Sequence, residues 1–173
     1  MTAAAHEPAG ASFLAAARAV LDARRAQRGE PRFGDDADGR LLQALVAMPD
    51  DGASALAART TGCALGREVF ARRVFEDSMP GCIVVLSIHL TQSGWGKLHL
   101  LEHFHRSATA RFEPEPALAS ASNGPLRELI AGIVEGTFAE AFNCRAEARA
   151  LDGFRVEVML LEGRDVNHGG GYS

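Results

Sequence analysis

The chain of 173 residues is 47% hydrophobic and 23% charged, which is the composition of an ordinary globular domain. Its net charge is −4 and its pI is about 5.9, so nucleic acid and anionic membrane surfaces are poor candidates for its partner. No apolar run is long enough to cross a membrane. Three isolated cysteines and the lack of a secretory leader predict a cytoplasmic protein with reduced thiols.

Two ends without any periodic pattern bound one predicted domain. Residues 1–10 are expected to be a disordered tail and residues 164–173 a flexible tail, so a single domain spans 11–163. Apolar residues at helical spacing predict the first helix from Phe13 to Arg24, with Ser12 as its cap.

The next segments along the chain mix helical and strand patterns. Asp38 is expected to cap a second helix (RLLQALVAM), and a long third helix covers 54–76 until the turn at 79–81 stops it. The β-branched run CIVVLSIHL at 82–90 predicts a strand. We expect this strand to form a hairpin with a second strand at 96–105.

The second half surrounds one strong helix with strands. RSATARFEPE alternates as a strand does, and an apolar stripe predicts a helix across PLRELIAGIVEGTFAEAFN. The segment CRAEARALDGFRVEVMLLEG predicts a last hairpin, whose five-residue loop at 149–153 pairs Glu147 with Arg155. Together these elements predict an α+β fold, an antiparallel sheet of about four to five strands packed against three to four helices.

Paired glycines lie inside the two best helices. Gly62 and Gly66 are four residues apart in one helix, and Gly132 and Gly136 in the other. An interior helical glycine costs about 1 kcal/mol relative to alanine, so four of them need a reason. Glycines four residues apart share one face, which lets another backbone or a flat ligand come close. We favour close packing of the helices and keep a ligand slot as the alternative.

The segment GPLRELIAGIVEGTFAEAFNCRAEARALDGFRVEVML resembles the C-terminal half of the 4-vinyl-reductase domain and of its relatives, the Bet-type adaptors of the TRAPP transport complex. TTGCALGREVFARRV and GWGKLHL are similar to earlier parts of that family, so the resemblance covers about residues 54–162. It implies an α+β domain, commonly dimeric, that binds small apolar molecules, senses aromatic compounds, assists tetrapyrrole biosynthesis or acts as an adaptor. Where many bacterial members carry cysteines, this chain has residues such as Leu126, Ala150 and Phe154. No cysteine metal site is therefore carried over.

Half of the histidines gather in GWGKLHLLEHFHR. On a strand, His99, His103 and His105 point to one face and Leu98 and Leu100 to the other. We favour the solvent side of a half-exposed strand. The alternatives are a transition-metal site that uses His103 and His105 with a ligand from elsewhere, hydrogen bonds to a bound molecule, and a pH-dependent interface.

Catalytic signals are weak, and we expect a protein without enzymatic activity. Cys63, Cys82 and Cys144 lie in apolar segments, where thiols are usually inert. No nucleophile elbow, phosphate-binding loop, dinucleotide fingerprint or zinc-protease helix occurs.

The leading hypothesis is a non-enzymatic domain of sensory or accessory type that binds a small apolar or aromatic molecule; no cofactor is identified. One alternative is an adaptor without ligand, a homodimer formed through the N-terminal helices. Another is a metal- or tetrapyrrole-binding accessory protein that uses the histidine-rich strand. The candidate ligand-binding residues are apolar or aromatic: Val69, Phe70, Trp95, Ile130, Ile133, Val134 and Phe138.

Overall fold

The computed structural model of the protein describes residues 9–26, 36–70, 78–119 and 124–161. Residues 1–8 of the predicted N-terminal tail and the whole predicted C-terminal tail, 164–173, lie outside the described residues. So does the end of the predicted third helix at 71–76. The first helix begins at Ala9, so Ala9 and Gly10 belong to it rather than to a disordered tail.

Within these ranges the fold combines helices with one antiparallel sheet. The helices are α1 (Ala9–Ala26), α2 (Asp36–Val46), α3 (Gly52–Phe70), α4 (Met79–Gln92), the short α5 (Pro116–Ala119) and α6 (Gly124–Ala141). The strands are β1 (Gly96–His103), β2 (Ser107–Pro114), β3 (Arg145–Leu151) and β4 (Arg155–Leu161). Their spatial order is β1-β2-β4-β3, and every neighbouring pair is antiparallel. The predicted α+β class and antiparallel sheet are confirmed.

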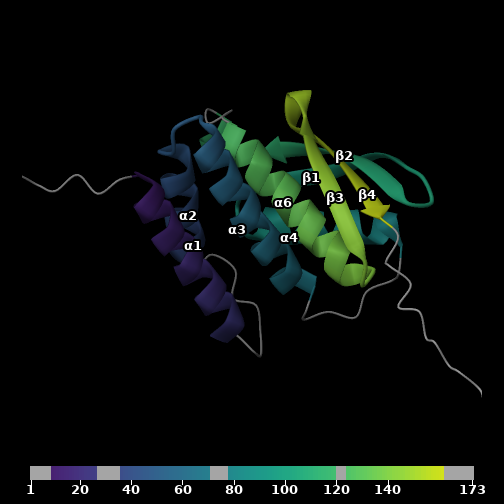
Figure 1. Ribbon diagram of the computed structural model, residues 1–173, viewed down its shortest axis with the longest axis horizontal. Helices are drawn as coiled ribbons and strands as arrows, with labels where there is room; N and C mark the ends of the chain where they lie inside the picture. The colour runs from purple at the N-terminus through teal and green to yellow at the C-terminus, as the bar shows by residue number, and fades with distance from the viewer. Residues whose placement is uncertain (1–8, 27–35, 71–77, 120–123, 162–173) are drawn as a thin grey trace, which may run out of the picture.

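The elements form successive layers. In Figure 1, α6 lies against the sheet, α3 lies beside α6, and α1 and α2 lie farthest from the strands. None of the helices in the described ranges is long and apolar enough to cross a membrane. The core runs through all of these layers, from Phe13 on α1 and Leu41 on α2 to Val158 on β4.

Two neighbouring aspartates cap the two central helices. The Asp51 carboxylate accepts a hydrogen bond of 2.8 Å from the Ser54 N–H at the start of α3. The Asp50 carboxylate accepts one of 3.0 Å from the Gly124 N–H, the first residue of α6. The bond from the Ser54 N–H lowers the pKa of Asp51. Both helices therefore begin at the same end of the molecule, and each has a carboxylate where the helix dipole is positive.

The segment 82–90 is a helix, so the predicted strand is wrong. Ser78 caps α4 by accepting from the Gly81 N–H at 3.1 Å, and Pro80 lies in the first turn. The buried residues of α4 follow helical spacing: Met79, Cys82, Ile83, Leu86 and Leu90. Burial of this stripe outweighs the β preference of the branched residues. The predicted hairpin between 82–90 and 96–105 is therefore absent.

The register of the last hairpin also differs from the prediction. Arg155 pairs with Leu151, not with Glu147, because the connection is a short turn at Asp152–Phe154 rather than a five-residue loop. Gly153 and Phe154 both have positive φ there, 66° and 56°. One face of the hairpin is buried at four residues: Ala146, Ala148, Val156 and Val158.

Two predicted helix caps are wrong as well. Ser12 lies inside α1, which begins at Ala9, and Asp38 lies inside α2, which begins at Asp36. Both helices start four residues earlier than the apolar periodicity indicates, at Ala9 instead of Phe13 and at Asp36 instead of Arg40, because periodicity marks the buried face and not the first turn.

Candidate functional site

The four glycines lie where α3 and α6 pack on each other. A Cβ added to any of them would come closer than 3.0 Å to a backbone oxygen of the other helix. Gly62 lies against Leu129 and Gly132, and Gly136 lies against Cys63. The opposite backbone fills the space left by the missing side chains. No room for a flat ligand remains at the glycines themselves.

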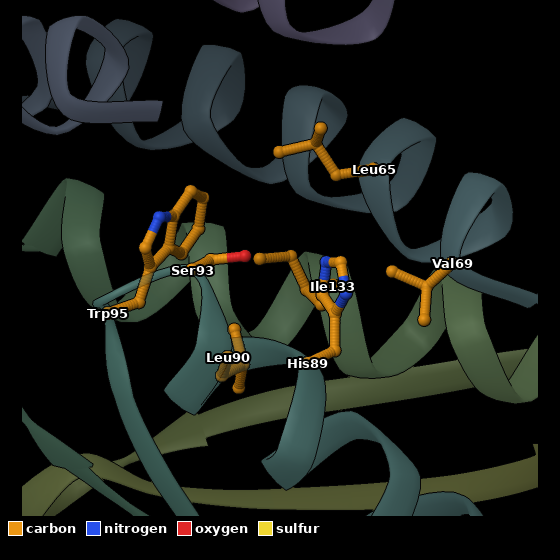
Figure 2. A pocket seen from close by; sticks show the side chains of 7 residues that line it. All are labelled: Leu65, Val69, His89, Leu90, Ser93, Trp95 and Ile133. Atoms are coloured by element: carbon orange, nitrogen blue, oxygen red, sulfur yellow. The ribbon is translucent and has the colours of Figure 1, made fainter. Parts of the chain in front are cut away.

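A pocket lies next to this contact, where α3, α4, α6 and the turn before β1 meet (Figure 2). Val69, Trp95 and Ile133, which were predicted separately as wall residues, all line it. Leu65, Leu90, His89 and Ser93 complete the lining. The sequence prediction missed these four.

Two of the missed residues add polar groups to an apolar pocket. His89 was not a candidate because segment 82–90 was predicted to be a strand. Ser93 follows that segment and was not a candidate either. In Figure 2 the Ser93 hydroxyl points toward Ile133. The helical spacing from Ser78 onward was the signal that could have located both residues.

The other predicted wall residues do not line this pocket. Ile130, Val134 and Phe138 are buried in the core, and Phe138 stacks on Phe142 with ring centroids 5.9 Å apart. The side chain of Phe70 lies outside the described residues.

The pocket is closed in this structure. The space between its side chains is too narrow for a water molecule. Trp95 is only 1% exposed, and the structure gives its indole N–H no hydrogen-bond acceptor. Figure 2 shows the indole nitrogen on the side of the ring that faces away from the other labelled residues. The ring therefore presents carbon atoms, not its N–H, to the pocket.

A polar cluster on the other side of α3 joins α3, α6 and β3. The Arg59 guanidinium bonds the carboxylates of Glu128 at 3.0 Å and Glu135 at 2.6 Å, and it donates to the Ala148 carbonyl. Glu135 also accepts from the Ala148 N–H at 2.9 Å and from the Cys63 thiol at 3.3 Å. The 76 residues between Arg59 and Glu135 leave no local sequence signal for this cluster.

The electrostatics of the cluster keep its thiol protonated and its carboxylate ionised near neutral pH. Burial and the neighbouring Glu135 carboxylate raise the pKa of Cys63 to about 11, so the thiol stays protonated near neutral pH. Burial alone would raise the pKa of Glu135. The bonds from Ala148, Arg59 and Cys63 outweigh it and lower that pKa. The cluster thus holds an inert thiol and a stable carboxylate.

His99, His103 and His105 lie at exposed positions, the first two on β1 and the third just after it. His99 and His103 do not share a face as predicted, because the register shifts between Leu100 and Glu102. His99 pairs with exposed Arg111, whereas His103 pairs with buried Ala108. His105 follows the strand. His99 Nε2 lies 3.0 Å from the Glu113 carboxylate.

A metal site remains only a prediction. In the part of the chain that the structure describes, no three histidine, cysteine, aspartate or glutamate side chains are close enough to hold an ion. The assignment of His103 and His105 as metal ligands therefore stays a sequence-based prediction.

No protein-family profile matches the chain, and neither does any curated protein. The similarity to the 4-vinyl-reductase domain and the TRAPP adaptors therefore stays a prediction made from the residues quoted above.

Proposed function

We propose that this protein is a non-enzymatic, cytoplasmic domain of sensory or accessory type that binds a small apolar or aromatic molecule. The site is the pocket between α3, α4 and α6. The observation that carries the proposal is the meeting of Val69, Trp95 and Ile133 from three separate elements around one pocket. Ligand pockets are mostly apolar with a few polar groups, and His89 and Ser93 supply these.

One wall of this pocket is held by backbone contact, so a ligand would have to displace the other wall. Val69 and Ile133 belong to α3 and α6, whose backbones touch at the glycines and cannot slide apart locally. The opposite wall is the end of α4 and the turn that carries Ser93 and Trp95. Gly94 in that turn has φ 72° and open space around it. Ligand entry therefore requires movement of the α4 end and the turn, with α3 and α6 as the fixed base.

The test uses Trp95, the single tryptophan of the chain, as the reporter. The full chain is titrated with small aromatic molecules that do not fluoresce at the tryptophan wavelength, such as toluene and p-cresol, while Trp95 emission is recorded. The purified protein is also weighed under native and denaturing conditions to detect a copurified organic molecule. Saturable quenching, or a copurified mass lost on denaturation, supports the proposal.

Two variants separate binding in this pocket from unspecific contact. V69F fills the pocket, because Val69 is 8% exposed and lines it. V84F makes the same change on the exposed side of α4, where Val84 is 56% exposed. We expect V69F to weaken saturable quenching at least tenfold and V84F to leave it unchanged. Equal quenching in both variants, or none in the wild type together with no copurified mass, would overturn the proposal.

A dimeric adaptor is the second candidate, and exposed apolar side chains on the N-terminal helices favour it. Leu14 on α1, Val46 on α2 and Leu56 on α3 are 56%, 45% and 68% exposed. A contiguous exposed apolar patch is typical of a contact surface, so this candidate requires the three side chains to lie on one face. Sedimentation of the wild type and of L56D distinguishes the cases: loss of a dimer in L56D supports the adaptor, and a wild-type monomer excludes this dimer.

A further inference from the structure

Helix side chains bond backbone groups on both edge strands of the sheet, β1 and β3. An uncovered edge strand offers unpaired N–H and C=O groups to any other strand. On β1, the Ser87 hydroxyl accepts from the Leu98 N–H at 3.0 Å, and the Thr91 hydroxyl donates to the Gly96 carbonyl at 3.1 Å. Ser87 and Thr91 are one turn apart on α4, so this helix lies along the β1 edge.

On the β3 edge, an ion pair takes the place of a neighbouring strand. The Ala148 N–H donates to the Glu135 carboxylate, and the Ala148 carbonyl accepts from the Arg59 guanidinium. An adjacent antiparallel strand would offer the same acceptor and the same donor to this residue. Arg59 and Glu135 are bonded to each other at 2.6 Å, so the two groups act as one unit.

We propose that the Arg59–Glu135 pair is a lock on the β3 edge, and that the edge beneath it fits β3 of a second copy of the chain. Ala148 directs both backbone groups outward, which makes it the natural centre of an antiparallel pair related by a two-fold axis. In that register Glu147 of each copy lies opposite Arg149 of the other. Both side chains are exposed on β3, and their charges are opposite.

Charge also selects this register over its neighbour. A pairing centred on Glu147 would place Glu147 opposite itself and Arg145 opposite Arg149, so like charges would face each other throughout. The pairing centred on Ala148 therefore combines outward backbone groups with favourable charges, which the pairing centred on Glu147 does not. It needs the space that the Arg59 and Glu135 side chains now occupy.

The lock lies at the surface and is held by charge-assisted bonds. The side chains of Arg59 and Glu135 are 20% and 25% exposed, so solvent reaches the lock. Glu128 bonds Arg59 but not β3. It supplies a matched control, because its loss removes one charge from the same cluster without uncovering the strand.

The experiment compares the mass of full-length variants by sedimentation velocity and native mass spectrometry. We expect R59A/E135A to double the mass of whatever assembly the wild type forms, and E128Q to leave that mass unchanged. Adding R149E to R59A/E135A should restore the wild-type mass, because Glu147 then meets a glutamate. Adding E147R as well should double the mass again.

Amide exchange gives an independent readout of the same edge. The Ala148 N–H should exchange at least tenfold faster in R59A/E135A/R149E than in the wild type, and it should be protected again in the R59A/E135A dimer. If R59A/E135A loses its circular dichroism spectrum, R59A/E135S replaces it, because serine keeps a hydroxyl within the cluster. An unchanged mass in folded R59A/E135A or R59A/E135S, or a dimer that R149E does not dissociate, would refute the proposal.

Discussion

Gly136→Ala tests whether backbone contact between α3 and α6 holds the core together. The added Cβ would lie closer than 3.0 Å to the carbonyl oxygen and carbon of Cys63, and a backbone cannot rotate away as a side chain can. Overpacking of a filled core costs about 1–3 kcal/mol, and the backbone clash places this site at the upper end. Alanine returns about 1 kcal/mol through its higher helix propensity. The net loss of stability is therefore about 2 kcal/mol.

The assay is urea unfolding followed by circular dichroism, with Gly39→Ala as the matched control. A Cβ at Gly39, also within a helix, meets no atom within 4 Å, so that variant should gain roughly 0.5–1 kcal/mol. For a chain of this size, G136A should also melt roughly 4–8 °C below the wild type. The reasoning is refuted if G136A is as stable as the wild type or moves in the same direction as G39A.

Three further predictions concern hydrogen bonds described above. Because the pKa of Glu135 is lowered, its contribution to stability is present above its usual value of 4.5 and is lost as the pH falls through the lowered pKa; unfolding at pH 3 to 6 should therefore depend less on pH in E135Q than in the wild type. Cys63, with a pKa of about 11, should react with iodoacetamide near pH 8 roughly a hundredfold more slowly than an ordinary thiol, as peptide mass mapping will show, and E135Q should speed the reaction. Ser87→Ala leaves the Leu98 N–H without its acceptor and should cost about 1 kcal/mol in urea unfolding, whereas Ser12→Ala on the exposed side of α1 should cost almost nothing.

Segment 82–90 shows where sequence patterns misled the prediction of the fold. Ile83, Val84 and Val85 favour a strand as isolated residues, and the preceding Pro80 was taken only as the end of a helix. The same proline is typical of the first turn of a new helix, and Ser78 before it is a good cap. Local propensity lost to the burial of a helical stripe, which depends on partners far away in the chain.

The candidate site was predicted only as far as its apolar residues. Trp95 and Ile133 could be recognised as wall residues because burial follows periodicity, but their meeting at one pocket depends on the packing of α4.

The final hairpin contained a stronger local signal than the one used. Asp152-Gly153 is a preferred pair for a tight turn and indicates a connection shorter than five residues, although a two-residue turn there would pair Leu151 with Phe154 instead of Arg155. The Arg59–Glu135 pair could not be predicted, because long-range packing alone brings these residues together.

The contact between α3 and α6 also determines when the core can form. Thr137 donates to the Gly66 carbonyl across 71 residues, and the glycine faces meet across similar distances in the chain. During synthesis, α3, α4, β1 and β2 therefore leave the ribosome well before α6, the helix that covers the glycine face of α3. Contacts so far apart in sequence slow folding, because the loop must close before any contact stabilises it. We expect this domain to fold late and in one step, after α6 has emerged, with α3 unprotected until then.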